Sequence, residues 1–403
     1  MLKAVARLER DIMTMQGRLQ YKRYLMYPEG YASKQRLMEM QGVKSIAPLD
    51  EFLGIDNIPF AYTTDLALHI AKTAACSSSY EDAADRLKEY GVGPDQARRV
   101  TDYIGEIINT YDKQRIRTLV STYDPKRCRA AKRGRRPKEG FTLYLEMDGA
   151  FFNTRGKNIE GSSWKETKLG LAFKSNDLVK SNDGSFHVGS REYLSTNEGV
   201  EEFRSCLIAL AISNGLYDAN RVVILSDGAP WITNTRDSFF PFAIRILDLY
   251  HLKEKVGKFS FQVFKGKKQE AKRAEWVKRV NEMLEEGKWR DVLKLEEVGA
   301  YKGVKVNFAA GEVNLYKYID DNSDFIDYPK YRTEGMFVGS GAIESGNKNV
   351  MQRRLKLSGM RWKIVRAQNL MALRCKLMSS NLWDMIVVPQ VTKMYKKGNK
   401  ATG

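Results

Sequence analysis

Three acidic residues stand in settings that suit metal-assisted chemistry on phosphate. Asp148 follows the run LYLEM at 143–147, Asp227 follows VVILS at 222–226, and each is followed by a glycine. Apolar runs of this length that end at a glycine turn predict strands. Glu344 lies where a glycine-rich loop, 339–341, passes into a helix-like stretch. Two strand-end carboxylates and one helix carboxylate can converge on a pair of divalent ions, which take oxygen ligands and leave positions open for phosphate and water.

The three carboxylates could have different roles in phosphodiester transfer. Two ions roughly 3.5–4 Å apart would activate the attacking oxygen and stabilise the leaving oxygen. Asp148 is suited to bridge both ions, while Asp227 binds one and Glu344 the other. Each acid taken alone also fits an ordinary turn, since Asp-Gly is a common turn dipeptide. The joint pattern favours a site for two Mg²⁺ ions.

One histidine stands beside these acids in the sequence. His251 follows Asp248 by three residues, just past the apolar run at 243–249. It could contact a phosphate or orient a metal-bound water. A lone histidine beside an apolar strand is also a common structural hydrogen-bonding residue, and the sequence leaves both interpretations open.

Composition points to a polyanionic partner. The chain has 403 residues, with 67 Lys and Arg against 49 Asp and Glu, a formal net charge of +18. This balance favours nucleic acid through phosphate contacts and counterion release, although a solvated basic surface is the alternative. The four cysteines and three histidines lack the spacing of a zinc site. Cysteines scattered singly along the chain suit a reducing cytoplasm. Charged residues interrupt the N-terminal stretch, so we expect no signal peptide, no membrane span, and a cytoplasmic, nucleoid-associated protein.

The N-terminal third is expected to bind DNA. We predict a mainly helical region over 1–124 that begins with an amphipathic helix. Within it, residues 79–109 resemble a helix-turn-helix, with Arg98 and Arg99 on its second helix. An ordinary helical hairpin in a core would give the same pattern. Residues 125–138 hold eight basic residues and no acid. We expect an extended linker that contacts DNA, with solvated linker as the alternative; its arginines include Arg133, Arg135 and Arg136.

The remainder is expected to be an α/β catalytic region interrupted by helices. Strands are predicted at 141–152, 168–174, 186–194, 221–227 and 243–249, within a first catalytic part at 139–266. The chain from Asp227 to Glu344 is longer than one sheet-to-helix connection needs, and residues 267–334 read as a helical insertion. The catalytic core then closes with a helix carrying Glu344, within 335–378. Residues 379–403 are predicted to be a basic tail, and its run at 393–400 is expected to be disordered.

Basic residues follow Glu344 along its helix. Lys348 lies one turn later and could hold the scissile phosphate. Arg353, Arg354 and Arg361 could grip the DNA backbone, and Trp362 could stack on a splayed base. A buried tryptophan surrounded by surface arginines is the alternative for Trp362.

Several of these segments together resemble bacterial insertion-sequence transposases of the Kra and Lre types, which look related to Mutator-like DDE transposases. The resemblance covers roughly residues 50–378. The segments that carry it are DGAPWI at 227–232, ILDLYHL at 246–252, GSGAIESGNK at 339–348, QRRLK at 352–356 and GMRW at 359–362.

The resemblance implies a ribonuclease-H-like catalytic domain with a helical insertion. It carries over Asp148, Asp227 and Glu344 as the catalytic triad with two Mg²⁺ or Mn²⁺ ions, and His251 as part of a D-x-x-H element. The implied partners are double-stranded DNA, both terminal inverted repeats and target, with a homodimer or higher oligomer assembled on it. Family members often carry a cysteine pair before the leucine-aspartate block at 49–50, and residues 24–31 have none.

Two other functions fit the same residues. A hydrolytic nuclease would use the three carboxylates without joining DNA ends. A domesticated DNA-binding protein would retain the fold with a silent site. The presence of all three acids argues against the second, and we expect a transposase that cuts at element ends and transfers the ends to a target.

Overall fold

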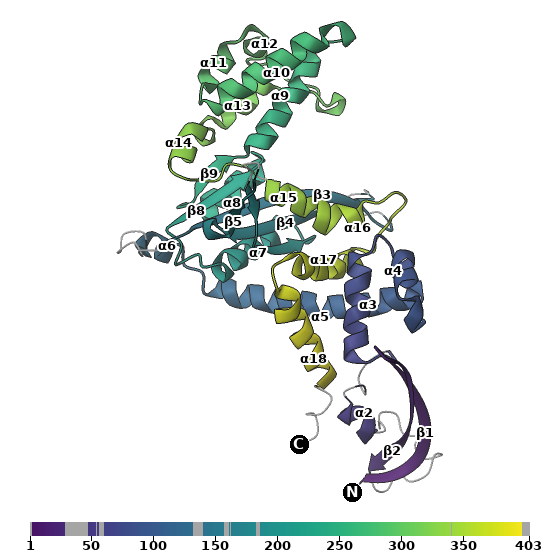
Figure 1. Ribbon diagram of the computed structural model, residues 1–403. Helices are drawn as coiled ribbons and strands as arrows, with labels where there is room; N and C mark the ends of the chain where they lie inside the picture. Colours follow the sequence, from purple (N-terminus) through teal and green to yellow (C-terminus); the bar gives the residue numbers. More distant parts are fainter. Residues whose placement is uncertain are drawn as a thin grey trace. The chain divides into compact units, whose positions relative to one another are not determined.

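The computed structural model describes residues 2–28, 47–53, 55, 60–131, 140–156, 161, 163–182, 186–339 and 341–396. The chain divides into two compact units (Figure 1). Unit 1 comprises Met1–Gln114, Asn153–Ser163 and Val350–Gly403, and unit 2 comprises Arg115–Phe152 and Trp164–Asn349. Unit 1 is therefore assembled from segments that are far apart in the sequence. Among the described residues, none of the helices combines the length and the apolar character needed to cross a membrane.

A five-stranded mixed sheet lies at the centre of unit 2, in the order β7-β4-β3-β8-β9. β3 pairs parallel with β8, β8 pairs parallel with β9, and β4 pairs antiparallel with β7. This confirms the predicted α/β class. The expected strand at 186–194 is divided, because β6 pairs with β5 in a separate hairpin. The bounds are β3 Thr142–Asn153, β4 Trp164–Lys174, β5 Leu178–Lys180, β6 Phe186–Val188, β7 Glu192–Thr196, β8 Arg221–Ser226 and β9 Ile244–Leu247.

The alternation of side chains along β3 gives the sheet two different faces. Leu143, Leu145 and Met147 belong to an apolar core that also contains Phe203 and Leu207 of α7 (Val200–Ser213). The intervening residues of the strand lie on the other face. There Tyr144 stacks on Phe173 with ring centroids 4.9 Å apart. Glu146 and Asp148 share that second face, so the strand period alone sets these two acids on the same side.

Helices connect and cover the strands of unit 2. α8 (Pro230–Phe239) joins β8 to β9, and α9 (Leu249–Val263) begins directly after β9. After the insertion the chain returns as α15 (Gly341–Gly346), a π-helical stretch η6 (Asn347–Gln352) and α16 (Arg353–Leu355). This helical run bears out the predicted helix that begins near Ile343 and continues past Arg354.

A helical module occupies the predicted insertion and packs along α9 (Figure 1). Its core includes Phe259 of α9 and Trp276 of α10, with ring centroids 6.0 Å apart. Two tyrosine hydroxyls tie the module to the sheet: Tyr318 donates to the Asp227 carbonyl and Tyr328 to the Leu247 carbonyl, each at 3.0 Å. The bounds are α10 Glu270–Glu285, α11 Trp289–Lys294, α12 Glu296–Gly299, η4 Phe308–Ala310, α13 Leu315–Asp321, η5 Ser323–Phe325 and α14 Tyr328–Thr333.

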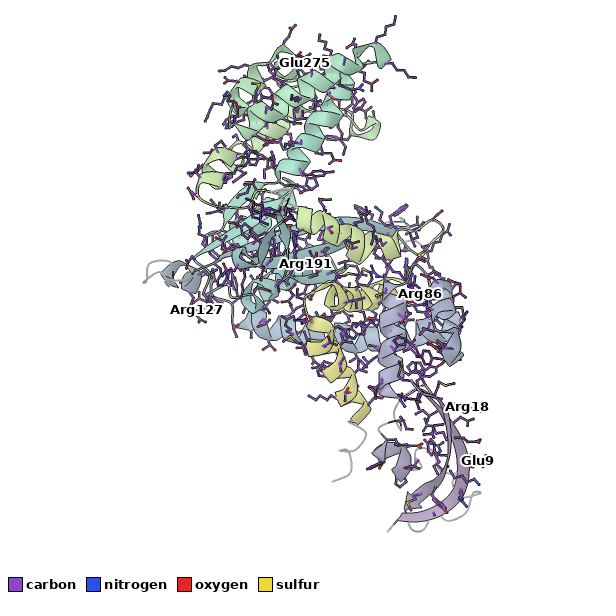
Figure 2. All side chains as sticks on the ribbon, viewed as in Figure 1. Glu9, Arg18, Arg86, Arg127, Arg191 and Glu275 are labelled. Atoms are coloured by element: carbon purple, nitrogen blue, oxygen red, sulfur yellow. The ribbon has the colours of Figure 1, made fainter. Side chains whose placement is uncertain are left out.

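The start of unit 1 is a β-hairpin, so the predicted N-terminal helix is wrong. β1 (Leu2–Thr14) and β2 (Gly17–Pro28) pair antiparallel around a turn in which Gly17 has φ +116°. Figure 2 shows the exposed side chains of Glu9 and Arg18 on this hairpin. Its apolar residues also fit a helical period, but a tertiary contact decides against the helix. Buried Asp50 of α2 (Pro48–Phe52) accepts hydrogen bonds from side chains of both strands, namely Arg10, Tyr21 and Arg23.

The rest of unit 1 is helical, as predicted. α4 (Tyr80–Arg86) begins at an N-cap, where the Ser79 hydroxyl accepts from the Asp82 amide at 3.1 Å. A left-handed glycine, Gly91, precedes α5 (Pro94–Ser121). Apolar residues of α4 and α5 are buried in one core with α3 (Thr64–Cys76). The α4–α5 pair therefore contributes to a helical core, and its role as a DNA-reading motif stays a prediction.

The C-terminal segment also belongs to the core of unit 1. The disorder predicted for 393–400 is therefore wrong for residues 393–396, which are helical, and residues 397–400 lie outside the described residues. The elements of the segment are α17 (Ile364–Met378), a π-helical turn η7 (Trp383–Val387) and α18 (Val388–Lys396). Trp383, Ile386, Val387, Val391 and Tyr395 are buried against the helices of the N-terminal part. Their helical spacing forms an apolar stripe along these elements.

The basic segment after α5 is not extended throughout. Pro125–Ala131 form α6, and buried Cys128 contributes to the core of unit 2. Asp124 caps its start by accepting from the Lys126 amide at 2.9 Å. The prediction of an extended linker is therefore wrong for its first half. Residues 132–139, with Arg133, Arg135 and Arg136, lie outside the described residues.

One glycine sets how closely α15 can approach the sheet. A Cβ added at Gly346 would lie 2.6 Å from Cε1 of Tyr193 on β7. We expect Gly346→Ala to lower the free energy of unfolding by roughly 1–3 kcal/mol through overpacking. The matched control is Gly341→Ala in the same helix, where an added Cβ meets nothing within 4 Å. Chemical denaturation of both variants measures this, and equal stability of the two would contradict the close approach.

Candidate active site

Three aspartates lie in a row across adjacent parallel strands of unit 2. The register pairs Glu146 with Leu225 in β3 and β8, and Ser226 with Leu247 in β8 and β9. Continued by one or two residues, this register brings Asp148, which lies within β3, level with Asp227 and Asp248, which directly follow β8 and β9. The Asp248 amide donates to the Ser226 carbonyl at 2.8 Å, which extends the ladder to that point. Neighbouring strands are about 4.8 Å apart, so this row brings acidic groups close together.

Asp148 is held by groups from two elements. Its Oδ1 accepts from the Gly149 amide at 2.7 Å, and its Oδ2 accepts from the side-chain amide of Asn347. Burial raises the pKa of Asp148, the two hydrogen bonds lower it, and the charge of Asp227 raises it. The two hydrogen bonds thus fix the orientation of the Asp148 side chain. Burial makes its charged carboxylate form less favourable than it would be in water.

His251 connects Asp248 to Glu344. Asp248 is fully buried at the N-cap of α9, where it accepts from the amides of Tyr250 and His251. The His251 ring places Nδ1 2.6 Å from Oδ2 of Asp248 and Nε2 3.2 Å from Oε1 of Glu344. Although burial lowers the pKa of His251, the hydrogen bond and charge of Asp248, together with Glu344 and Asp227, raise it to about 9. At neutral pH the ring is an imidazolium between two carboxylates.

Glu344 approaches from α15, over the face of β3 that carries Asp148. The Ile343 amide next to it donates to Oε2 of Glu146 at 2.8 Å, which docks the start of the helix on the strand. Burial raises the pKa of Glu344, His251 lowers it, and Asp148 and Asp248 raise it. Electrostatic coupling thus links Asp227 with Asp148 and Asp148 with Glu344, the three acids that the sequence singled out.

Glu146 adds a further acid beneath this cluster. Its side chain is fully buried, and burial raises its pKa well above the ordinary value, against the opposing hydrogen bond from Ile343. Burial thus favours the neutral form of Glu146. Its hydrogen bond from the Ile343 amide makes it a polar anchor for α15.

The donor set matches the oxygen ligands that Mg²⁺ and Mn²⁺ prefer. It combines several carboxylates with one compensating cation, His251. In the part of the chain that the structure describes, no three His, Cys, Asp or Glu side chains are gathered closely enough to hold a metal ion as they stand. The type of ligand therefore fits a divalent ion, while His251 at present occupies one oxygen of Glu344.

The other predicted residues fall in both units. Lys348 is exposed in η6, in unit 2. Arg98 and Arg99 lie on α5, where Arg98 is paired with Asp95 and Asp102. Arg353 and Arg361 are exposed, whereas Arg354 and Trp362 are buried against one another in unit 1. The structure thus places Trp362 inside, as in the alternative that the sequence left open, and places Arg354 there too.

Sequence analysis missed three residues that shape the site. Glu146 could have been found from its position two residues before Asp148 in a strand. Asn347 could have been found from its position three residues after Glu344 in a helix. Asp248 appeared only as part of the D-x-x-H spacing, and its burial and capping role depend on where β9 ends. The role of these three residues cannot be recognised from residue type alone.

Residues 6–379 match the sequence profile of an uncharacterised protein family, UPF0236. The chain belongs to this family. No curated protein matches the chain. The matched residues include segments of both units.

The raised pKa of His251 can be measured directly. We expect an NMR pH titration to show one imidazole with a pKa near 9, and His251→Gln to remove that signal from the three histidines. Because the folded pKa exceeds the unfolded value of about 6.5, the stability that His251 contributes is fully present below that pH. It is lost as pH rises through about 9. Asp248→Asn should lower the pKa, and an unchanged titration in that variant would contradict the pairing.

Proposed function

We propose that this protein is a DNA transposase in which Asp148, Asp227 and Glu344 serve metal-dependent phosphodiester chemistry. The observation that carries the proposal is the row of carboxylates formed by Asp148 within β3 and by the aspartates directly after β8 and β9, which Glu344 of α15 joins from the side. The resemblance to insertion-sequence transposases matches these same residues to the catalytic triad of that family.

The architecture of unit 2 supports the proposal. The central strand β3 carries the first acid, a parallel pair lies on one side and an antiparallel pair on the other. A helical module separates the second acid from the third. These features agree with the ribonuclease-H-like domain with a helical insertion that the resemblance implies. The net charge of +18 agrees with a DNA partner.

The reaction has two steps that use the same site. Water attacks a phosphodiester at each element end, the bond to the 3′-oxygen breaks, and a proton returns to give a 3′-hydroxyl. That hydroxyl then attacks a target phosphodiester in line and displaces a target 3′-oxygen, so one bond forms for each bond broken. Divalent ions, when bound, activate the attacking oxygen and stabilise the leaving oxygen.

The residues of this chain have distinct tasks in that scheme. Asp148, Asp227 and Glu344 would hold the ions. Asn347 fixes the orientation of Asp148, and His251, itself held by Asp248, positions Glu344. Lys348, exposed shortly after Glu344, is proposed to contact the scissile phosphate. Joining two ends requires both to be brought together, so we propose that the protein acts as a dimer or higher oligomer on DNA.

Substitution of the acids tests the chemistry. We expect Asp148→Asn, Asp227→Asn and Glu344→Gln each to slow Mg²⁺-dependent cutting of labelled element ends by roughly a thousand-fold or more, because each removes a charged ligand worth several kcal/mol. DNA binding should persist. Glu275→Gln is the matched control, because Glu275 is exposed on α10 (Figure 2).

The products of that assay separate the candidate functions. Ends joined to target DNA are expected for a transposase, and cut fragments without joined products would favour a hydrolytic nuclease. Full activity of Asp148→Asn would contradict both. Absence of cutting by the wild-type protein, with specific binding of the ends, would favour a DNA-binding protein with a silent site.

Metal binding should depend on pH. Protons compete with metal for Asp148 and Glu344, whose pKa values are raised above the ordinary range mainly by burial. We therefore expect Mg²⁺ or Mn²⁺ to raise the Tm of the wild-type protein more at pH 8 than at pH 5. Asp148→Asn should lose most of this shift. A Tm shift of equal size in that variant would place the metal elsewhere.

A further inference from the structure

Unit 1 contains a basic cavity that the catalytic chemistry does not use. It has a volume of about 250 Å³, and every residue that lines it belongs to unit 1. The lining combines the start of α4, one turn of α5, the segment after β3, and the chain from Arg354 to Arg366. It presents six cationic side chains against one carboxylate, that of exposed Glu81. The cations are Arg98, Arg155, Arg354, Arg361, Lys363 and Arg366.

Arg354 is the most unusual of these cations. Its side chain is 1% exposed, and its guanidinium lies 4.6 Å from the ring centre of Tyr80 and 5.0 Å from that of Trp362. Nη1 reaches the sulfur of Met360 at 3.9 Å, whereas Nε and Nη2 have no hydrogen-bond partner among the described residues. Burial lowers the pKa of Arg354, but an arginine remains charged at neutral pH.

Other buried arginines donate to oxygen acceptors of the protein. Arg374 donates from Nε to the Val350 carbonyl at 2.6 Å and from Nη1 to the Ala75 carbonyl. Arg245 donates from Nη2 to Oδ1 of Asn322 at 3.2 Å, although its Nε has no hydrogen-bond partner among the described residues. Arg354 has two aromatic faces and a sulfur, and none of these accepts a charge-assisted hydrogen bond well. A buried charge left in this way is costly unless something else compensates it.

The aromatic walls of the cavity also contribute donors. Nε1 of Trp362 and Oη of Tyr80 have no hydrogen-bond partner among the described residues. Burial raises the pKa of Tyr80 to about 12, so its hydroxyl keeps its proton at neutral pH. The backbone of Trp362 is fixed, since its amide donates to the Asn153 carbonyl at 2.9 Å and its carbonyl accepts from the Arg155 amide at 2.8 Å. Fixed donors without acceptors favour an anionic ligand.

The cations differ in how far they are already compensated. Arg98 and Arg366 share Asp102, at 3.1 Å and 2.9 Å. No carboxylate within ion-pair distance of Arg155, Arg354, Arg361 or Lys363 is found among the described residues. A planar guanidinium suits bidentate binding of a phosphate, and flexible rim cations add long-range attraction.

We propose that this cavity binds one backbone phosphate of DNA, with Arg354 as its bidentate donor. The inference rests on the proposed function only for the identity of the polymer, because the phosphate site itself is separate from the carboxylate chemistry. Arg354 and Trp362 thus take part in DNA binding although both are buried in unit 1. Trp362 orients the Arg354 guanidinium and does not stack on a base.

Replacement of Arg354 by an apolar residue of similar length tests the site. We expect Arg354→Met to weaken binding of a short fluorescein-labelled duplex at least ten-fold without divalent metal, as measured by anisotropy. The slope of log affinity against log salt should fall by about one, the value for a single lost phosphate contact. The Tm should stay unchanged or rise, because the variant removes a buried unpaired charge. Arg86→Gln, an exposed arginine of α4 that is paired with Asp82 (Figure 2), should bind as the wild type does.

Further variants cover a failure of Arg354→Met to fold. Arg354→Lys keeps the positive charge and removes the planar guanidinium that can bind phosphate through two nitrogens. The double variant Arg361→Gln, Lys363→Gln removes two exposed cations at the edge of the cavity and leaves Arg354 in place. Each should weaken DNA binding and lower the salt slope. Wild-type affinity and slope in all of these variants would overturn the proposal. Titration with inorganic phosphate distinguishes the source of the ligand: phosphate bound through Arg354, with DNA affinity unchanged in the variants, would overturn the assignment to DNA.

The outcome can be separated from that of the proposed function. Cutting of ends by Arg354→Met at saturating DNA, with weakened binding, supports both proposals. Arg354-dependent DNA binding by a wild-type protein that never cuts would support the pocket and contradict the transposase. Cutting and binding by Arg354→Met that match the wild type would support the transposase and overturn the pocket.

Discussion

Crowding of like charge, between Asp148 within β3 and the aspartates that directly follow β8 and β9, is the constraint on which unit 2 depends. Parallel pairing forces Asp148, Asp227 and Asp248 into one row, because the register fixes all three once the strands pair. The chain relieves this repulsion in several ways. Asp248 is compensated by His251 and by two backbone amides, and Asp148 by Asn347 and Gly149. Burial is the main cause of the raised pKa values of Asp148 and Glu344, and the charges of neighbouring acids raise them further.

The same constraint explains where the helical module can be inserted. Asp248 ends the sheet and caps α9, so the chain leaves the site through a helix that the acid itself begins. It returns through α15, which Glu146 fastens to β3. Between these fixed points the module is anchored by Tyr318 and Tyr328 to backbone carbonyls at the ends of β8 and β9. A large insertion is thus tolerated because both of its ends are held by polar contacts of the site.

Much of unit 2 could be predicted from local sequence, because apolar runs of strand length ending in Asp-Gly are strong signals. The register could not. Residue types do not reveal that Asp148 and Asp227 pair level with one another, or that His251 bridges Asp248 and Glu344. The failures in unit 1 have a related origin. The hairpin at 2–28 and the helix α18 depend on contacts with Asp50 and with the helical core, which are distant in sequence. Net basic charge also concealed the apolar stripe of α18.

Several of the chain's buried charges have partners of opposite charge, so the sites where such partners are lacking are candidates for ligand binding. Buried Asp50 accepts from two arginines and a tyrosine, and fully buried Lys376 lies 2.7 Å from Asp112. With 49 acidic and 67 basic residues the chain has ample material for such pairs. Nevertheless the cluster around Asp148 carries more acid than base, and Arg354 is buried without an acceptor for two of its nitrogens. Cations would compensate the acidic cluster of unit 2, and an anion would compensate the Arg354 cavity of unit 1. Each of the two sites therefore needs its own ligand, of charge opposite to that of the site.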